Sequence, residues 1–198
     1  MHVLLLGPFN STIGNYLISQ GCEISQTEEQ IFLKELLERN VDFIISYRYR
    51  HLIKKEVINH FPGKIINLHI SYLPWNRGAD PNLWSYFENT PKGVTIHLVD
   101  VGLDTGDIVV QQLIDDNFED TLYTSYQRLS EAIENLIILT WHSIIRGEIK
   151  PVPQNLSEGT AHRSRDKQTY ESLLTDGWHT PVKHLIGKAL KKGDDIDV

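Results

Sequence analysis

Nearly continuous apolar runs and helical patterns alternate along the first part of the chain. Three runs have the length of a strand: Val3 to Leu6, Val41 to Ser46 and Lys64 to Leu68. Runs of this kind are typical of strands covered on both faces. Helices are expected between them, one capped by Ser11 or Thr12 and running to about Gln20, the other over Lys54 to His60. This alternation predicts an α/β fold with a mostly parallel sheet and helices on both of its faces.

Start and stop signals predict further helices. Thr27 and Gln30 have the spacing of a capping box, so a helix is expected from Glu28 to Arg39. A long helix is expected from Thr121 to Arg146, because its apolar residues recur at three- and four-residue intervals and Gly147 follows. A short helix and two β-rich segments complete the predicted elements: 82–88, 94–99 and 108–114.

The composition changes after Pro151. With 198 residues, 40% of them hydrophobic, the chain can bury one sizeable core, and residues 1–150 carry the predicted strands and helices of that domain. Residues 151–198 are more polar and finish in a Lys/Asp-rich end. We expect this region to be a C-terminal appendage whose last residues are mobile.

Charge and cysteine content exclude several classes of protein. A net charge of -7 disfavours nucleic acid as the main partner, while leaving room for a local basic pocket. Cys22 is the single cysteine, so no internal disulfide framework is expected, and no run is apolar enough to span a bilayer. We therefore expect a cytoplasmic protein without a membrane partner, and the sequence leaves its oligomeric state open, a homodimer included.

Polar chemistry gathers between residues 67 and 112. Asn67 and His69 lie at the exit of an apolar strand, and Asp104 lies in a loop flanked by Gly102 and Gly106. Ligands of parallel sheets bind at the carboxyl ends of the strands, so these side chains are expected at one edge. An amide, an imidazole and a carboxylate together suggest acyl transfer.

The same stretch resembles a known family. Its motifs follow in order: Asn67-Leu68-His69, Ser71, Leu73-Pro74, Arg77-Gly78, Pro81, Gly93-Val94-Thr95-Ile96-His97 and Asp104-Thr105-Gly106-Asp107-Ile108, with Gln111 or Gln112. This order is similar to the catalytic signature of formyltransferases that use N10-formyltetrahydrofolate. The resemblance implies a formyltransferase-type, Rossmann-like sheet, here with a shortened N-terminal region.

The resemblance also implies roles for particular residues. The catalytic set would be Asn67, His69 and Asp104, with Asn67 and His69 donating to the oxyanion and Asp104 orienting or charging His69. The folate cosubstrate would lie between two segments: Arg50, His51, Leu52 and Ile53 on one side, and Asp100, Val101, Gly102 and Leu103 on the other. No metal is implied. His97 stays outside the catalytic set, as either a buried histidine or a supporting residue.

The acceptor is predicted from the positions at which this sequence matches some members of the family and departs from others. Arg77 and Trp84 lie in a run that looks most like the small enzymes acting on nucleotide-linked amino sugars, and Asn10 and Ser11 at a helix start are candidates for holding a phosphate. Core packing is the favoured role of Trp84, and Arg77 could equally form a structural ion pair. The other readings are glycinamide ribonucleotide formyltransferase, disfavoured by Pro8 in the first loop, formyltetrahydrofolate hydrolase, and a folate- or nucleotide-binding module without turnover.

Overall fold

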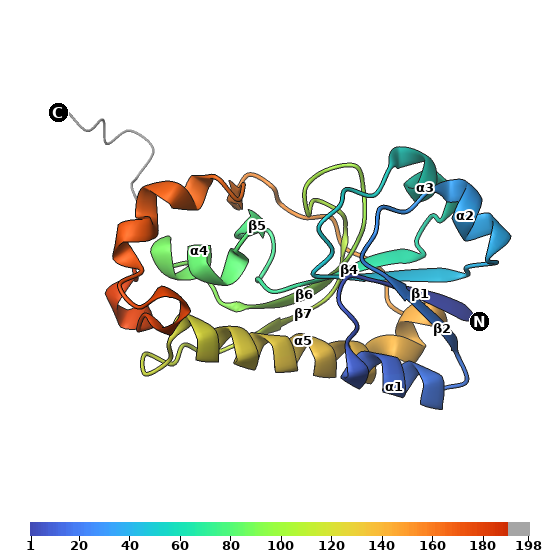
Figure 1. The fold of residues 1–198 in the computed structure, drawn as a ribbon, viewed down its shortest axis with the longest axis horizontal. Coiled ribbons are helices and arrows are strands. Elements are labelled where there is room, and N and C mark those ends of the chain that lie inside the picture. Colours follow the sequence, from blue (N-terminus) through green and yellow to red (C-terminus); the bar gives the residue numbers. More distant parts are fainter. Residues whose placement is uncertain (190–198) are drawn as a thin grey trace.

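A six-stranded sheet forms the centre of the molecule in the computed structural model, which describes residues 1–189 (Figure 1). The strand order is β2-β1-β3-β4-β6-β7. β1 to β4 pair in parallel, whereas β6 pairs antiparallel with both β4 and β7. The strands are β1 (His2–Leu6), β2 (Glu23–Thr27), β3 (Phe43–Tyr47), β4 (Ile65–His69), β6 (Gly93–Leu98) and β7 (Ile108–Leu113). The predicted α/β fold with a mostly parallel sheet is confirmed.

Helices cover both faces of this sheet, also as predicted. α1 (Ser11–Ser19) and α5 (Leu122–Ile145) lie on one face, and α2 (Leu33–Glu38) and α3 (Lys55–His60) lie on the other (Figure 1). Side chains alternate along β1, because successive residues of a strand point to opposite faces. Val3 and Leu5 enter the core beneath α1 and α5, while Leu4 and Leu6 enter the core beneath α2 and α3.

Two of the sequence predictions near the N-terminus are wrong. The helix expected over Glu28 to Arg39 begins only at Leu33, because Thr27 ends β2 and its Oγ1 accepts from the Glu29 N–H in a turn. β2 was missed, since this edge strand lacks an apolar run. The cap of α1 is Asn10, whose Oδ1 accepts from the Ile13 N–H at 2.9 Å, not Ser11 or Thr12. The long helix is confirmed, with Thr121 as its cap.

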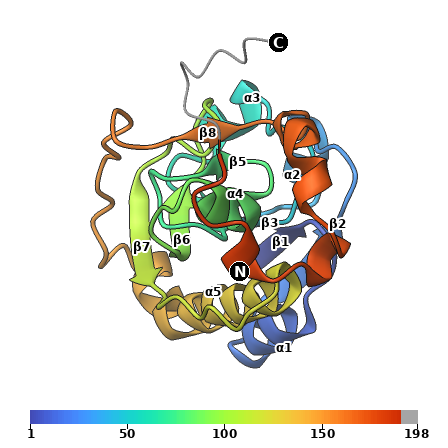
Figure 2. The same cartoon turned by 90° about the vertical axis from the view of Figure 1, so that its left-hand side faces the viewer.

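The chain after residue 150 packs against the rest of the molecule. β8 (Ala161–His162) pairs with β5 (Arg77–Gly78), and three 3-10 helices follow, Asp166–Leu173, Gly177–His179 and Val182–His184 (Figure 2). Val182 and Leu185 share an apolar cluster with α4 (Pro81–Phe87) and the start of α5. The last residues expected to be mobile, 190–198, lie outside the described residues. Among residues 1–189, no helix combines the length and the apolar character that crossing a membrane requires.

Candidate active site

A pocket of about 870 Å³ opens at the carboxyl ends of β3 and β4. Its walls come from these strand ends, from the segment after β3 and from the loop between β6 and β7. It is lined by Asn67, His69 and Asp104, the three residues of the predicted catalytic set, and by both predicted folate segments, 50–53 and 100–103. The structure therefore brings together predicted site residues that are up to 54 positions apart, from Arg50 to Asp104.

Strand pairing places His97 beside Asn67. The two residues are partners across the antiparallel ladder of β4 and β6, and the Asn67 Nδ2 lies 3.2 Å from the His97 Nε2. The His97 Nδ1 lies 2.7 Å from the carbonyl oxygen of Leu98. Because a carbonyl only accepts, Nδ1 carries a proton and donates, and the Nε2 lone pair can accept from the Asn67 amide. His97, 2% exposed, thus supports Asn67 rather than lying idle in the core.

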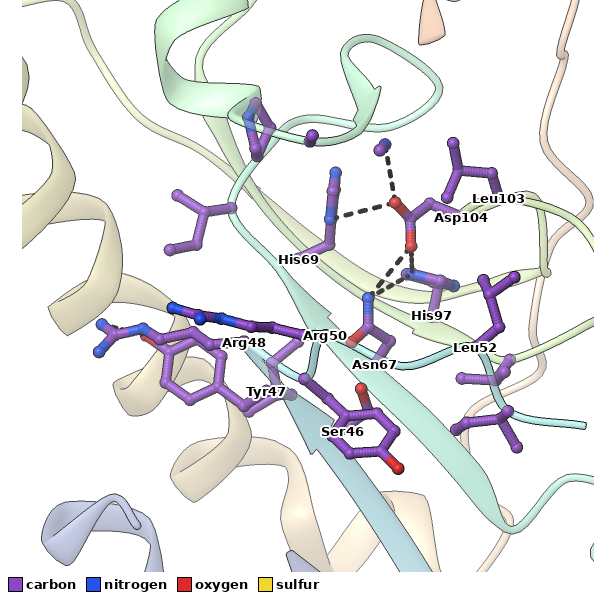
Figure 3. Close-up of a pocket in the computed structure, with 18 of the residues that line it drawn as sticks. Ser46, Tyr47, Arg48, Arg50, Leu52, Asn67, His69, His97, Leu103 and Asp104 are labelled. Carbon is purple, nitrogen blue, oxygen red and sulfur yellow. Dashed lines mark hydrogen bonds and ion pairs between the residues drawn. The ribbon is translucent and has the colours of Figure 1, made fainter. Parts of the chain in front are cut away.

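Asp104 joins the two histidines to Asn67 (Figure 3). Its Oδ1 accepts from the Asn67 Nδ2 at 3.2 Å and lies 3.5 Å from the His97 Nε2. Its Oδ2 accepts from the Gly78 N–H at 2.8 Å and lies 3.6 Å from the His69 Nδ1. These contacts come from both sides of the carboxylate and fix its orientation.

The electrostatics of this cluster favour an ionised Asp104 and a neutral His69. Burial alone would raise the pKa of the Asp104 carboxyl, but attraction to the protonated forms of His69 and His97 and the hydrogen bond from the Gly78 N–H outweigh burial and hold that pKa far below its usual range. Burial lowers the pKa of His69, and the attraction of Asp104 offsets this only in part. A neutral imidazole beside a fixed carboxylate can accept a proton and then be stabilised as the imidazolium.

The loop that carries Asp104 depends on a close backbone approach. Asp104 has a positive φ of 51°, and a Cβ added at Gly106 would come within 1.8 Å of the Leu98 carbonyl oxygen. Gly106 therefore lets the loop return tightly against the end of β6. The Gln154 side chain donates to the carbonyls of Asp104 and Gly106, so the segment after Pro153 also holds this loop.

The two ends of the pocket differ in character (Figure 3). At one end Leu52 and Leu103 are 78% and 42% exposed, an apolar surface open to the pocket. At the other end Arg48 and Arg50 point the same way, and the Arg48 guanidinium lies 4.6 Å from the ring centre of Tyr47. Across the region described here, neither guanidinium forms an ion pair with a carboxylate. Asn67, His69, His97 and Asp104 lie between these ends.

The four residues predicted to bind the acceptor do not line this pocket. Asn10 caps α1 and donates to Glu134, and Ser11 is exposed beside it. Arg77 pairs in β5, where its Nε donates to the Thr160 carbonyl. Trp84 is 3% exposed and stacks on His162 in the core.

Sequence reasoning missed three residues on the arginine end of the pocket. Arg48 lies two residues before the predicted folate segment and could have been considered with it. Tyr126 and Trp178 come from α5 and from the C-terminal region, and no sequence motif marks either of them. Among the described residues no group of His, Cys, Asp or Glu side chains could hold a metal ion.

Comparison with known proteins gives consistent matches. The family model described as "Formyl transferase" matches residues 11–140. The crystal structure of the formyltransferase PseJ from Anoxybacillus kamchatkensis, in complex with UDP-4,6-dideoxy-4-formamido-L-AltNAc and tetrahydrofolate, is 49% identical to this chain with a TM-score of 0.92. That match covers 96% of this chain and 100% of PseJ. A sugar N-formyltransferase from Shewanella, 21% identical, has the same fold with a TM-score of 0.75 over 98% of this chain and 90% of that one.

Methionyl-tRNA formyltransferases are also similar, but they are longer. The protein from Lachnospira eligens is 29% identical over 201 residues, which cover 93% of this chain and 64% of that protein. The matches to the proteins from Thermodesulfovibrio yellowstonii and Clostridium novyi cover 44% and 47% of their lengths. The chain therefore spans less than two thirds of these curated relatives. The family model and the PseJ match together show that this chain belongs to the formyl transferase family.

Proposed function

We propose that this protein transfers a formyl group from N10-formyltetrahydrofolate to the primary amine of a nucleotide-linked amino sugar. The observation that carries the proposal is the meeting of Asn67, His69 and Asp104 in one pocket. The similarity to PseJ, whose structure holds a UDP-linked formamido sugar and tetrahydrofolate, supports this acceptor class and this cosubstrate.

The cluster suits the steps of formyl transfer. The amine attacks the formyl carbon, and neutral His69 takes the proton that the nitrogen must lose. Both N–H groups of Asn67 have acceptors nearby, so its donation to the oxyanion would replace its 3.2 Å contact with Asp104. The resulting imidazolium, stabilised by ionised Asp104, can donate a proton to N10 as the tetrahedral intermediate collapses.

The two ends of the pocket suit the two substrates. The exposed apolar surface of Leu52 and Leu103 fits a flat ring such as the pteridine of folate, with the backbone of loop 100–104 beside it. Arg48 and Arg50, without a carboxylate partner among residues 1–189, fit the phosphates of a nucleotide. The formyl group and the amine would then meet at the cluster between them.

One assay tests the proposal. Tetrahydrofolate release from N10-formyltetrahydrofolate is followed without acceptor, with glycinamide ribonucleotide, and with UDP- and dTDP-linked amino sugars. Release that depends on an amino sugar is the expected result. Release with the ribonucleotide would assign the chain to that reaction, release without acceptor would make it a hydrolase, and folate binding without any release would leave a binding module.

The cellular location, the class of partner and the oligomeric state are also proposals. We propose a cytoplasmic enzyme that has small-molecule rather than nucleic-acid partners and is able to form a homodimer. The acidic net charge of -7 and the single cysteine support the first two points. Sedimentation equilibrium at micromolar concentration would test the third, since a mass near 22.8 kDa means a monomer.

A further inference from the structure

The second ring nitrogen of His69 has a partner of its own. The His69 Nε2 lies 3.2 Å from the backbone carbonyl oxygen of Asn76, while Nδ1 faces Asp104 at 3.6 Å. Both partners only accept hydrogen bonds, because Asp104 is ionised, but 3.2 Å is within hydrogen-bond distance and 3.6 Å is not, so the geometry favours a proton on Nε2. Asp104 lines the pocket and Asn76 does not, so Nδ1 is the nitrogen on the substrate side.

Asn76 is held by a set of buried hydrogen bonds. Its side chain is 0% exposed, and its backbone has a positive φ of 56°. The Oδ1 accepts from the Thr90 hydroxyl at 2.7 Å, and the Nδ2 donates to the Glu88 Oε2 at 2.9 Å. The backbone N–H donates to the Thr160 hydroxyl at 3.1 Å. An asparagine tolerates this backbone conformation, and the contacts keep its carbonyl aimed at His69.

Glu88 connects this arrangement to the C-terminal region. Its Oε2 also accepts from the Thr160 hydroxyl at 2.7 Å, and its Oε1 lies 3.0 Å from the His162 Nε2. The ring of His162 stacks on Trp84 at 3.8 Å between centroids. A mostly buried carboxylate with this many partners fixes several backbone segments at once. Residues 76–78 form one short segment that contacts both members of the His69–Asp104 pair, because the Asn76 carbonyl faces His69 and the Gly78 N–H donates to Asp104.

We propose that Glu88 is a positioning residue for the formyl transfer proposed above, on which this inference rests. Through Asn76 it keeps the proton of neutral His69 on Nε2 and leaves the Nδ1 lone pair facing the amine. Nδ1 is then the atom that takes the proton from the attacking nitrogen and returns it to N10. Glu88 itself touches neither substrate.

Activity measurements compare Glu88→Ala with Glu88→Gln, which retains an acceptor oxygen. Glu88→Ala is expected to lower kcat about 10-fold or more, because misplacing an acid-base group is costly even without a lost contact to substrate. The KM for the folate cosubstrate should stay within about twofold, and the acid limb of the kcat profile should move. Glu88→Gln should recover most of kcat. Glu158→Gln, at an exposed glutamate two residues before Thr160, is the control and should match the unmodified protein.

A second measurement reads the proton directly and needs no acceptor. In 15N-labelled protein, long-range nitrogen–proton correlation spectra show which imidazole nitrogen carries hydrogen, and His69→Gln identifies the His69 signals among the nine histidines. We expect hydrogen on Nε2, and a mixture of tautomers in Glu88→Ala. Thr160→Val, which removes one hydroxyl bonded to Glu88, should give a smaller change in the same direction if Glu88→Ala folds poorly.

Two results would overturn the inference. One is a His69 with its hydrogen on Nδ1 in the unmodified protein. The other is a Glu88→Ala variant with lower kcat but the original tautomer and pH profile, which would make Glu88 a structural residue only. If no amine acceptor supports turnover, the proposed function fails, yet the tautomer measurement still decides the role of Glu88.

Discussion

At the residue scale, His69 is the residue on which the proposed chemistry depends most. Replacing it in His69→Ala removes the proton acceptor, and general acid-base groups typically contribute about 10²- to 10⁴-fold in rate. We expect kcat to fall by that factor while folate affinity, measured by calorimetry, stays nearly unchanged, because the apolar surface of Leu52 and Leu103 lies to one side of His69 in the pocket. Unchanged turnover in this variant would remove His69 from the mechanism.

The depressed pKa of His69 sets the direction of the pH dependence. Burial lowers that pKa below its reference value of about 6.5, so the neutral form that accepts a proton persists to lower pH than in a free imidazole. In the unmodified protein kcat should therefore be level above about pH 6.5 and decline only on further acidification. A kcat that instead rose as the pH fell from 7 would contradict a neutral His69 base.

Asp104 should link stability to pH. Its pKa in the folded protein lies far below its unfolded value of about 3.9, so its ionisation stabilises the fold above that pH and the contribution is lost as the pH falls toward the folded pKa. Asp104→Asn should lower activity without unfolding the protein at pH 7. The difference in melting temperature between the unmodified protein and Asp104→Asn should narrow below about pH 4. A gap that is constant across this range would argue against the charge as its cause.

Arg50 offers a test of the acceptor end. Its guanidinium has no hydrogen bond or ion pair within the described chain, so Arg50→Gln should leave the melting temperature nearly unchanged. Losing a charged hydrogen bond to a phosphate costs about 1.5–3 kcal/mol, which predicts a rise of about 10- to 100-fold in the acceptor KM. The folate KM should stay constant, and the exposed Arg39→Gln serves as control. A rise in the folate KM alone would place the anionic tail of folate at this end.

The residues of the pocket differ in how far sequence could identify them. Asn67, His69 and Asp104 follow a motif with fixed order, and strand alternation already puts the first two on one face of β4. Trp178 and Tyr126 could not be predicted, because they reach the pocket only through the packing of helical segments distant in sequence. Trp84 was named as a candidate binding residue although core packing was favoured, and its 3% exposure places it in the core.

At the element scale, the helix predicted from Glu28 failed through a long-range contact. The Tyr49 hydroxyl donates to the Glu29 carbonyl at 2.7 Å and accepts from the Ile31 N–H at 3.2 Å. These bonds satisfy backbone groups that a helix would otherwise use, and Tyr49 lies 20 residues away from Glu29. Local capping signals carry no information about such a competitor. By contrast, α5 was predictable because its cap, Thr121, and its apolar stripe are both local.

The loop between β6 and β7 gives a prediction at this scale. In Gly106→Ala the new methyl group would meet the Leu98 carbonyl oxygen, so the loop and Asp104 must move. We expect kcat to fall by about 10²-fold, with the melting temperature of the whole protein affected less. Gly63→Ala is the comparison, because no atom lies within 4 Å of its added Cβ and its φ of 70° adds only local strain. Equal activity losses in both variants would show that the position of the loop does not matter.

At the scale of the whole molecule, the question is whether residues 151–189 fold with the rest. Leu185 is 0% exposed in the cluster formed with α4 and α5, whereas Leu156 in the same region is 43% exposed. If the molecule unfolds as one unit, Leu185→Ala should lower the free energy of unfolding by about 2–5 kcal/mol in a single transition, and Leu156→Ala by under about 0.5 kcal/mol.

Denaturant unfolding followed by tryptophan fluorescence and by circular dichroism measures both variants. An independent appendage would instead give Leu185→Ala an early, separate transition that leaves the main one unchanged. The distinction bears on the site, because Thr160 and Gln154 belong to this region and bond to Asn76 and to the Asp104 loop. A cooperative transition would mean that a loss of C-terminal packing also weakens the contacts that position His69 and Asp104. Activity and stability should then decline together across such variants.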